Sequence, residues 1–275
     1  MEKNAKRVLL INDLPGYGKA ALAAMTPILS KLGHYPFLLP TAVISNTLDF
    51  GKYRIEDMTD YMRDSLRVWE ELGFDYDCIC TGYVLNEKQA DLIAGFLNRL
   101  ADRKKRLVIV DPIMADGGRL YHGIGSERVV LMRRLAACAD VMTPNITEAG
   151  FLTGLCPGAE SGTREELRAL VDGLRDISGR SVVITSAVET ETGEHLVCGY
   201  DHRLREYFRV PYDYLPVRVA GSGDIFSAFM TGALLDGKTL REAVELAVTE
   251  LSRLLTENWE RREDYKGILL ERYWR

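Results

Sequence analysis

The segment RLVIV at residues 106–110 is a continuous apolar run that ends at Asp111 and Pro112. A second run of this kind, SVVIT, occupies residues 181–185. Strands of a parallel sheet are buried on both faces and are typically continuous apolar runs, whereas half-exposed strands alternate apolar and polar residues. Both segments therefore predict buried parallel strands.

Similar short runs alternate along the chain with longer segments whose apolar residues recur at helical intervals. Predicted strands lie at residues 7–12, 35–42, 77–81, 106–110, 139–142 and 181–185, followed by a hairpin at 195–198 and 204–210. Predicted helices lie at residues 19–32, 55–72, 87–100, 126–137, 163–177, 221–235 and 240–255. This alternation predicts an α/β fold with one doubly wound, mostly parallel sheet flanked by helices. No linker or repeat interrupts the 275 residues, so we expect residues 1–275 to form a single domain whose tail, 256–275, docks as a last helix.

The composition of the chain argues against nucleic acid and membranes as binding partners. The chain has 35 Lys and Arg against 40 Asp and Glu, a net charge of −5, so no basic surplus is available to bind nucleic acid. No apolar run reaches the ~18 residues that span a membrane, and residues 1–7 are charged, so we expect a cytoplasmic protein without a membrane partner. The five cysteines form no CxxC pair and are expected to be buried thiols.

Two phosphate-binding patterns are present without the structural context they need. GALLDGKT at residues 232–239 matches a P-loop, but the residues before it are typical of a helix. We interpret Gly237 as the end of that helix and Thr239 as the cap of the next one. GYGKAA at residues 16–21 resembles a dinucleotide-binding turn, but no acidic residue ends the following strand, so NAD binding is not expected.

The segment VAGSGDIFSA at residues 219–228 places two glycines, a serine and an aspartate at the start of a predicted helix. The first amides of a helix have no internal partner, and together with the helix dipole they favour an anion such as a phosphoryl group. By its position, Asp224 is either a helix cap or a base that removes a hydroxyl proton beside the anion.

Two acidic segments follow predicted strands. DPIMADGG at residues 111–118 carries Asp111 and Asp116, and TPNITE at residues 143–148 carries Asn145 and Glu148. Ligands of open α/β sheets bind at the carboxyl ends of the strands, and Mg²⁺ is usually bound by one or two carboxylates together with substrate phosphates. Taken with the glycine-rich turn at 221–224, these segments predict phosphoryl transfer.

The segments DPIMAD, TPNxTE and AGSGD, in this order and at these separations, resemble those of the ribokinase superfamily of ATP-dependent small-molecule kinases. TAVISNT at residues 41–47 and TGY at residues 81–83 are similar to segments of its pyridoxal kinase branch. The resemblance runs from about residue 7 to residue 255.

The resemblance implies a role for each matching position. Asp224 would be the catalytic base, and Gly221, Ser222 and Gly223 would form the anion hole for the γ-phosphoryl group. Asp111 and Glu148 would hold Mg²⁺. The implied ATP-side contacts are Asp111, Asp116, Tyr121, Thr143, Asn145, Glu148, Thr185 and Ser186. The implied substrate contacts are Asn12, Asp13, Thr41, Thr47 and Tyr83.

The sequence departs from the family on the substrate side. Thr47 stands where pyridoxal kinases have histidine, and Asn12-Asp13 stands where they have Ser-His. An acid at position 13 favours charge pairing with a substrate amine, as in pyridoxamine.

We therefore predict a kinase that uses ATP and Mg²⁺ to phosphorylate the hydroxymethyl group of a B6 vitamer. We expect the protein to be a homodimer, and the resemblance allows for a monovalent cation as a further cofactor. The alternative is a hydroxymethylpyrimidine kinase of the same superfamily. A second alternative is a non-catalytic protein that binds a B6 vitamer or a nucleotide.

Overall fold

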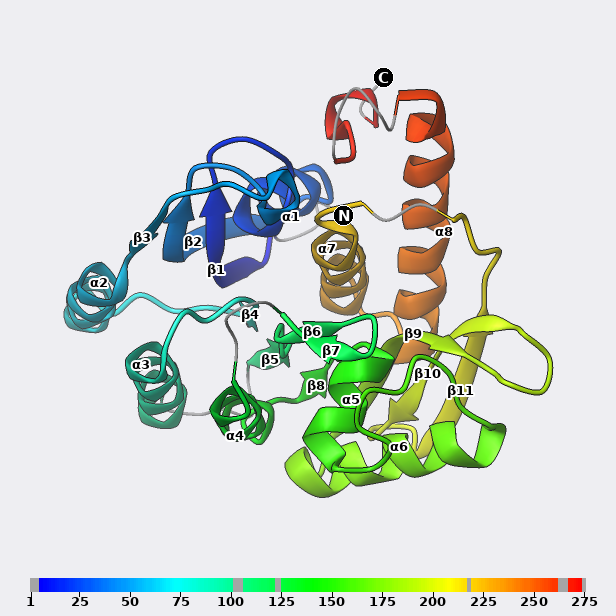
Figure 1. Ribbon diagram of the computed structural model, residues 1–275. Helices are drawn as coiled ribbons and strands as arrows, with labels where there is room; N and C mark the ends of the chain where they lie inside the picture. The colour runs from blue at the N-terminus through cyan, green and yellow to red at the C-terminus, as the bar shows by residue number, and fades with distance from the viewer. Residues whose placement is uncertain (1–4, 101–105, 122–124, 217–218, 262–266, 274–275) are drawn as a thin grey trace. The chain divides into compact units, whose positions relative to one another are not determined.

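Figure 1 shows the computed structural model, which describes residues 5–100, 106–121, 125–216, 219–261 and 267–273. The chain divides into two compact units. Unit 1 comprises Met1–Leu92 and Leu215–Arg275, and unit 2 comprises Ile93–Tyr214. Helix α3 (Glu87–Arg99) begins in unit 1 and ends in unit 2. The single domain expected from the sequence stays a prediction.

Unit 1 contains four strands in the order β4-β1-β2-β3. These are β1 (Arg7–Pro15), β2 (Tyr35–Ile44), β3 (Ile55–Asp57) and β4 (Cys78–Thr81). β1 pairs in parallel with both β2 and β4, and β3 joins β2 as a short antiparallel strand at the edge. Four consecutive residues of β1, from Val8 to Ile11, are completely buried, as expected of a central parallel strand.

The helices of unit 1 are α1 (Ala21–Lys31), α2 (Thr59–Glu71), α7 (Ser222–Leu235) and α8 (Leu240–Asn258), with single 3₁₀ turns at Leu48–Phe50, Trp259–Arg261 and Leu270–Arg272. α1 packs against β1 and α7, and α7 packs against α8. No helix in the described part of the chain is both long and apolar enough to span a membrane.

Unit 2 contains five strands in the order β11-β10-β9-β8-β5. They are β5 (Leu107–Val110), β8 (Val141–Met142), β9 (Ser181–Val188), β10 (His195–Asp201) and β11 (Glu206–Pro211). β5, β8 and β9 run parallel, and β10 and β11 continue antiparallel. The helices are α4 (Glu127–Ala136), α5 (Ile146–Thr153) and α6 (Arg164–Ser178), and a separate small hairpin consists of β6 (Ala115–Asp116) and β7 (Arg119–Leu120).

Most predicted elements are present, with boundaries shifted by a few residues. The helix predicted over residues 55–72 is wrong at its start, because Ile55–Asp57 pairs with β2 as a strand. The side chain of Asp57 then accepts a hydrogen bond from the Thr59 amide (2.8 Å) where α2 begins. Helix α5 and the β6–β7 hairpin were not expected. Over the described residues, the tail continues α8 to Asn258 and then forms 3₁₀ turns instead of one further helix.

The structure confirms that residues 232–239 are not a P-loop. Their first four residues continue α7, Gly237 has a left-handed φ of 89°, and Thr239 caps α8. The Thr239 side chain accepts from the Glu242 amide, and Glu242 accepts from the Thr239 amide (2.8 Å), which is a capping box. These residues therefore end one helix and begin the next.

Candidate functional site

The glycine-rich turn at residues 221–224 lies where α7 begins, as predicted. Gly221 is the residue before the helix and has a left-handed φ of 84°. A Cβ there would lie 2.9 Å from the Ala20 Cα, so any larger residue would push the two segments apart. The amides that follow belong to the first turn of a 14-residue helix, the position at which proteins bind anions.

Asp224 lies in this first turn, and its carboxylate is held by two other segments of unit 1. The Asn12 Nδ2 donates to Oδ1 (3.0 Å) and the Ala21 amide donates to Oδ2 (2.8 Å). Ala21 has a φ of 48°, which is uncommon for a residue other than glycine. Both hydrogen bonds come from outside α7, which favours the interpretation of Asp224 as a positioned functional group over that of a helix cap.

Two carboxyl groups in this cluster have raised pKa values. Burial raises the pKa of Asp224, although the hydrogen bonds from Ala21 and Asn12 lower it. Burial and, second, the negative charge of Asp224 raise the pKa of Asp13 to about 7. The structure therefore brings these two predicted residues close enough for their charges to interact.

The Asn12 side chain is hydrogen-bonded to Asp13, Tyr83 and Asp224. Its Oδ1 accepts hydrogen bonds from the Asp13 amide (3.0 Å) and the Tyr83 amide (2.7 Å), while Nδ2 holds Asp224. Asn12 is only 2% exposed. A Cβ on Gly82 would lie 2.5 Å from the Asn12 Cγ, so glycine at this position leaves room for the amide. Asn12 thus links three segments of unit 1 by hydrogen bonds, and its predicted contact with the substrate stays a prediction.

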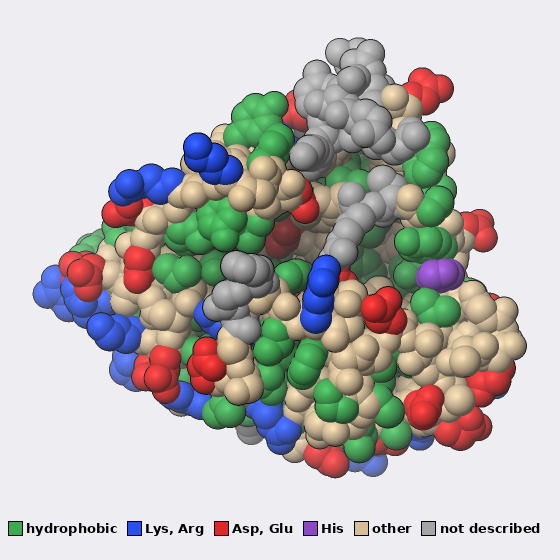
Figure 2. Space-filling model, in the orientation of Figure 1, with side chains coloured by type: hydrophobic (Ala, Val, Ile, Leu, Met, Phe, Trp, Pro, Cys, Tyr) green, Lys and Arg blue, Asp and Glu red, His purple; other side chains and the backbone are tan. Residues whose placement is uncertain are grey.

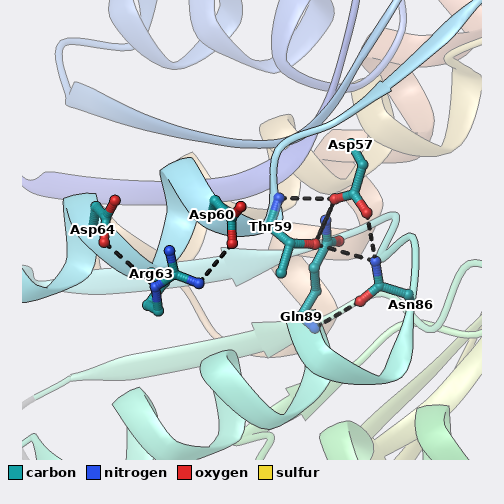
Figure 3. Close-up of polar contacts among 7 residues, drawn as sticks. All are labelled: Asp57, Thr59, Asp60, Arg63, Asp64, Asn86 and Gln89. Carbon is teal, nitrogen blue, oxygen red and sulfur yellow. Dashed lines mark hydrogen bonds and ion pairs between the residues drawn. The ribbon is translucent and has the colours of Figure 1, made fainter.

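Thr41 and Tyr83 are also linked to each other. The Thr41 hydroxyl donates to the Tyr83 carbonyl (2.8 Å), and Gln89 Nε2 donates to the Thr41 carbonyl (2.7 Å). Figure 3 shows Gln89 beside the Asp57, Thr59 and Asn86 side chains, which it joins in one hydrogen-bonded group. Gln89 is completely buried and was not predicted, since its sequence position is an ordinary early helical one.

A register shift accompanies this arrangement. Asn12 is opposite Pro40 and Leu14 is opposite Val43, so β2 carries one residue more than β1 at Thr41–Ala42. Such bulges change the direction of side chains and are common beside functional sites. This bulge lies opposite Asp13.

Thr47 lies in a loop held against residues 16–18. Its amide donates to the Tyr17 carbonyl (3.0 Å), and a Cβ on Gly18 would lie 3.2 Å from its hydroxyl. Thr47 is 6% exposed, and among the described residues its hydroxyl has no hydrogen-bond partner. A buried hydroxyl without a partner is costly, so this one is available to a polar ligand.

In unit 2, the Glu148 carboxylate accepts hydrogen bonds from three backbone amides. Its Oε1 accepts from the Met114 amide (2.9 Å) and the Ala115 amide (3.3 Å), and its Oε2 accepts from the Asn145 amide (3.0 Å). The Asn145 Oδ1 accepts in return from the Glu148 amide (2.9 Å), which completes a capping box at the start of α5. Asn145 Nδ2 also donates to the Ala115 carbonyl (2.8 Å).

Glu148 is 2% exposed, and burial raises its pKa to about 8. The three backbone amides lower the pKa, and the charge of Asp116 adds to the rise. The predicted pair Asn145 and Glu148 thus fastens the 114–116 segment to α5. The Asn-x-x-Glu signature of this capping box is present at residues 145–148, but only a ligand role was predicted for these two residues.

Asp116 and the two glycines after it form the turn of the β6–β7 hairpin. Gly117 and Gly118 have φ values of 57° and 75°, the left-handed conformation that tight hairpin turns require. The Gly117 amide donates to Asp116 Oδ1 (2.9 Å), and the Gly118 amide donates to the Thr147 hydroxyl (3.1 Å). Tyr121, which is 37% exposed, follows directly after β7.

The other predicted nucleotide-side residues are at strand ends of unit 2. Asp111 is half-buried directly after β5, and Thr143 is 1% exposed directly after β8. Among the described residues, the Thr143 hydroxyl has no hydrogen-bond partner. Thr185 and Ser186 lie in a bulge of β9, because Ile184 is opposite Cys198 while Ala187 is opposite Leu196.

Comparison with known proteins identifies the family. The family model described as phosphomethylpyrimidine kinase matches residues 28–268. The chain therefore belongs to the phosphomethylpyrimidine kinase family. This membership and the relatives below confirm the predicted resemblance to pyridoxal kinase-like members of the ribokinase superfamily.

Similar proteins cover almost the whole chain. A pyridoxine/pyridoxal/pyridoxamine kinase from Bordetella avium is 29% identical over 246 residues, which is 87% of this chain and 81% of that protein. The crystal structure of a candidate phosphomethylpyrimidine kinase from Bacteroides thetaiotaomicron has a TM-score of 0.92 and 32% identity, covering 99% of this chain and 93% of the other. A crystal form from that organism with pyridoxal has a TM-score of 0.90, 32% identity, and coverage of 98% and 94%. These likenesses confirm the predicted α/β fold.

The raised pKa of Glu148 predicts a pH-dependent stability. A carboxyl whose folded pKa lies above its ordinary value of 4.5 stabilises the folded state most below that value, and this contribution is lost as the pH rises to about 8. We expect the free energy of unfolding, measured by urea denaturation at several pH values, to fall over this range by up to about 1.4 kcal/mol per pH unit. Glu148→Gln should flatten the slope.

Glu166 offers a matched control, because it is the corresponding residue of the α6 capping box and is exposed. Glu166→Gln should retain the wild-type slope. An unchanged slope in Glu148→Gln would contradict the assignment of the titration to Glu148.

Proposed function

We propose that the protein is an ATP-dependent kinase that phosphorylates the hydroxymethyl group of a B6 vitamer. The observation that carries the proposal is the Asp224 carboxylate, held by Asn12 and Ala21 at the start of α7. Burial raises the pKa of Asp224, which makes its carboxylate a stronger proton acceptor. The relatives described as B6 kinases and the crystal form with pyridoxal support this choice of substrate.

In the proposed reaction, Asp224 takes the proton of the substrate hydroxymethyl group. The oxygen attacks the γ-phosphorus of ATP, a new P–O bond forms, and the bond to the β-phosphate oxygen breaks, so that ADP leaves with the electron pair. The amides of Gly221, Ser222 and Gly223 donate to the oxygens of the transferring group. Such transfer requires mainly positioning and charge stabilisation.

ATP is assigned to residues of unit 2 at strand ends and in the β6–β7 hairpin. The buried Thr143 hydroxyl, which lacks a partner among the described residues, supports a polar ligand there. The bulge at Thr185–Ser186 supports the same assignment, because bulges are common beside functional sites. The full proposed set is Asp111, Asp116, Tyr121, Thr143, Asn145, Glu148, Thr185 and Ser186.

The donor chemistry of unit 2 fits Mg²⁺, which binds through one or two carboxylates, phosphate oxygens and several waters. Within the described residues, no group of three or more His, Cys, Asp and Glu could hold a metal ion by itself. Both Glu148 oxygens already accept backbone hydrogen bonds, so Glu148 fits a water-mediated contact. Asp111, directly after β5, is the second carboxylate in the proposed magnesium site. When bound, Mg²⁺ neutralises charge on the phosphate oxygens.

A hydroxymethylpyrimidine kinase is the second candidate function, favoured by the description of the matching family. It would use the same base and the same helix N-terminus on a different ring. The non-catalytic alternative is disfavoured, because a binding protein has no need of a carboxylate positioned by two other segments. A cytoplasmic location is part of the proposal.

We propose further that two copies associate through the β2–β3 side of unit 1. Of the 16 large apolar side chains exposed among the described residues, 11 lie between residues 17 and 74. They include Leu38 and Val43 on β2, next to the short edge strand β3. Figure 2 shows apolar side chains, in green, at the surface over β1 and β2. Exposed apolar patches and unpaired strand edges are typical of association surfaces.

Replacing the base tests the reaction. Asp224→Ala should lower kcat by about 10²–10⁴-fold through loss of proton transfer, while the Kd for ATP changes little. The measurement is ADP release with pyridoxal, pyridoxamine, pyridoxine and hydroxymethylpyrimidine, together with calorimetric titration of ATP. The exposed Asp60 on α2 gives a control, Asp60→Asn, with wild-type kcat. Near-normal turnover by Asp224→Ala would refute its role as base.

Acidic substitutions on β2 test the proposed association surface. The double variant Leu38→Asp/Val43→Asp should sediment as a monomer where the wild type sediments as a dimer, because an interface would bury two unpaired carboxylates. Val130→Asp on α4, where Val130 is 62% exposed, is the control and should leave the dimer intact. A wild type that is monomeric at all concentrations contradicts the proposal.

A further inference from the structure

Asp13 is an acidic side chain beside the proposed base. Its amide donates to the same Asn12 oxygen that accepts from Tyr83, and the other end of the Asn12 amide holds Asp224. The strand bulge at Thr41–Ala42 lies opposite Asp13. One buried amide therefore fixes the backbone of Asp13 and the carboxylate of Asp224 relative to each other.

The charges around Asp13 are unbalanced. Asp224 is the charged group that acts on it most strongly, and it is also negative. Among the described residues, no Lys, Arg or His forms an ion pair with either carboxylate. Burial and this repulsion raise the pKa of Asp13 to about 7. A cation from a ligand would supply a positive partner.

The proposed reaction limits where such a cation could lie. The substrate hydroxymethyl group must contact Asp224, and in B6 vitamers the variable substituent is on the neighbouring ring carbon. In one of the two ring orientations that keep this contact, the substituent faces Asp13, whose carboxyl interacts with the charge of Asp224. It is an aldehyde in pyridoxal, a second hydroxymethyl in pyridoxine, and an aminomethyl group, cationic at neutral pH, in pyridoxamine.

We propose that Asp13 determines substrate specificity by pairing with an amine on the ring atom next to the reacting hydroxymethyl group, so that pyridoxamine is the preferred vitamer. This inference rests on the proposed function. A charge-assisted hydrogen bond to an ammonium group is stronger than one to a neutral oxygen. The amino group of hydroxymethylpyrimidine occupies the corresponding ring position and shares this donor chemistry without the full charge.

The first test is the wild-type enzyme with the three vitamers. We expect kcat/KM for pyridoxamine to exceed that for pyridoxal and pyridoxine by about 10- to 100-fold, the range given by one charge-assisted bond. Equal values for pyridoxamine and pyridoxal would overturn the proposal, and this measurement needs no variant.

The second test is Asp13→Asn, which keeps the size of the side chain and removes its charge. The ratio of kcat/KM for pyridoxamine to that for pyridoxal should fall towards 1, with the loss appearing in KM for pyridoxamine. Asp64→Asn on α2, at an exposed position, should keep the wild-type ratio. An unchanged ratio in a folded Asp13→Asn protein, checked by thermal melting, would overturn the proposal.

Failure of the proposed function gives a different result. If the wild type phosphorylates hydroxymethylpyrimidine and no vitamer, the B6 assignment is wrong. The role of Asp13 is then decided by KM for hydroxymethylpyrimidine, which should rise in Asp13→Asn and stay unchanged in Asp64→Asn. An unchanged KM in Asp13→Asn would refute the role of Asp13 for that substrate also.

Discussion

The side-chain amide of Asn12 makes hydrogen bonds to three parts of unit 1 that are far apart in sequence. Its oxygen accepts from Asp13 and Tyr83, and its nitrogen donates to Asp224, 212 residues away. Because Asn12 is 2% exposed, water cannot replace these bonds if one partner moves. The end of β1, the segment after β4 and the start of α7 are consequently held in one arrangement, and the position of the proposed base depends on it.

In unit 2, Glu148 joins separate segments by hydrogen bonds, as Asn12 does in unit 1. It also joins a strand-end segment to a helix N-terminus by several buried hydrogen bonds, but its side chain can ionise. Burial raises the pKa of Glu148 to about 8, whereas the Asn12 amide has no titration. The arrangement around Asn12 is therefore independent of proton binding by its central residue, and that around Glu148 is not.

Local sequence patterns predicted the parts of the structure that local chemistry determines. The helix at 221–235 was placed within one residue, because the glycines and the apolar run after them define its start. Residues 55–57 were misassigned, since their strand depends on pairing with β2. Gln89 gave no signal, because its importance comes from contacts with Thr41 and Asp57, which are 48 and 32 residues away. Asn12 was predicted from its place at a strand end, but its hydrogen bonds to Tyr83 and Asp224 join residues 71 and 212 positions away, which a local pattern does not indicate.

The departures from the pyridoxal kinase pattern are confined to residues that we propose surround the substrate ring, and the contacts explain how they can be tolerated. Asn12 hydrogen-bonds two amides and one carboxylate, so its exchange for another residue changes the hydrogen bonding at the end of β1. The backbone amide of Asp13 makes the hydrogen bond to Asn12 that positions this residue, so the bond does not depend on the Asp13 carboxyl group. The Thr47 hydroxyl, buried and without a partner among the described residues, is likewise not needed to hold its loop, which its amide does. Substrate preference can therefore change at positions 13 and 47 while the turn that carries Asp224 stays as it is.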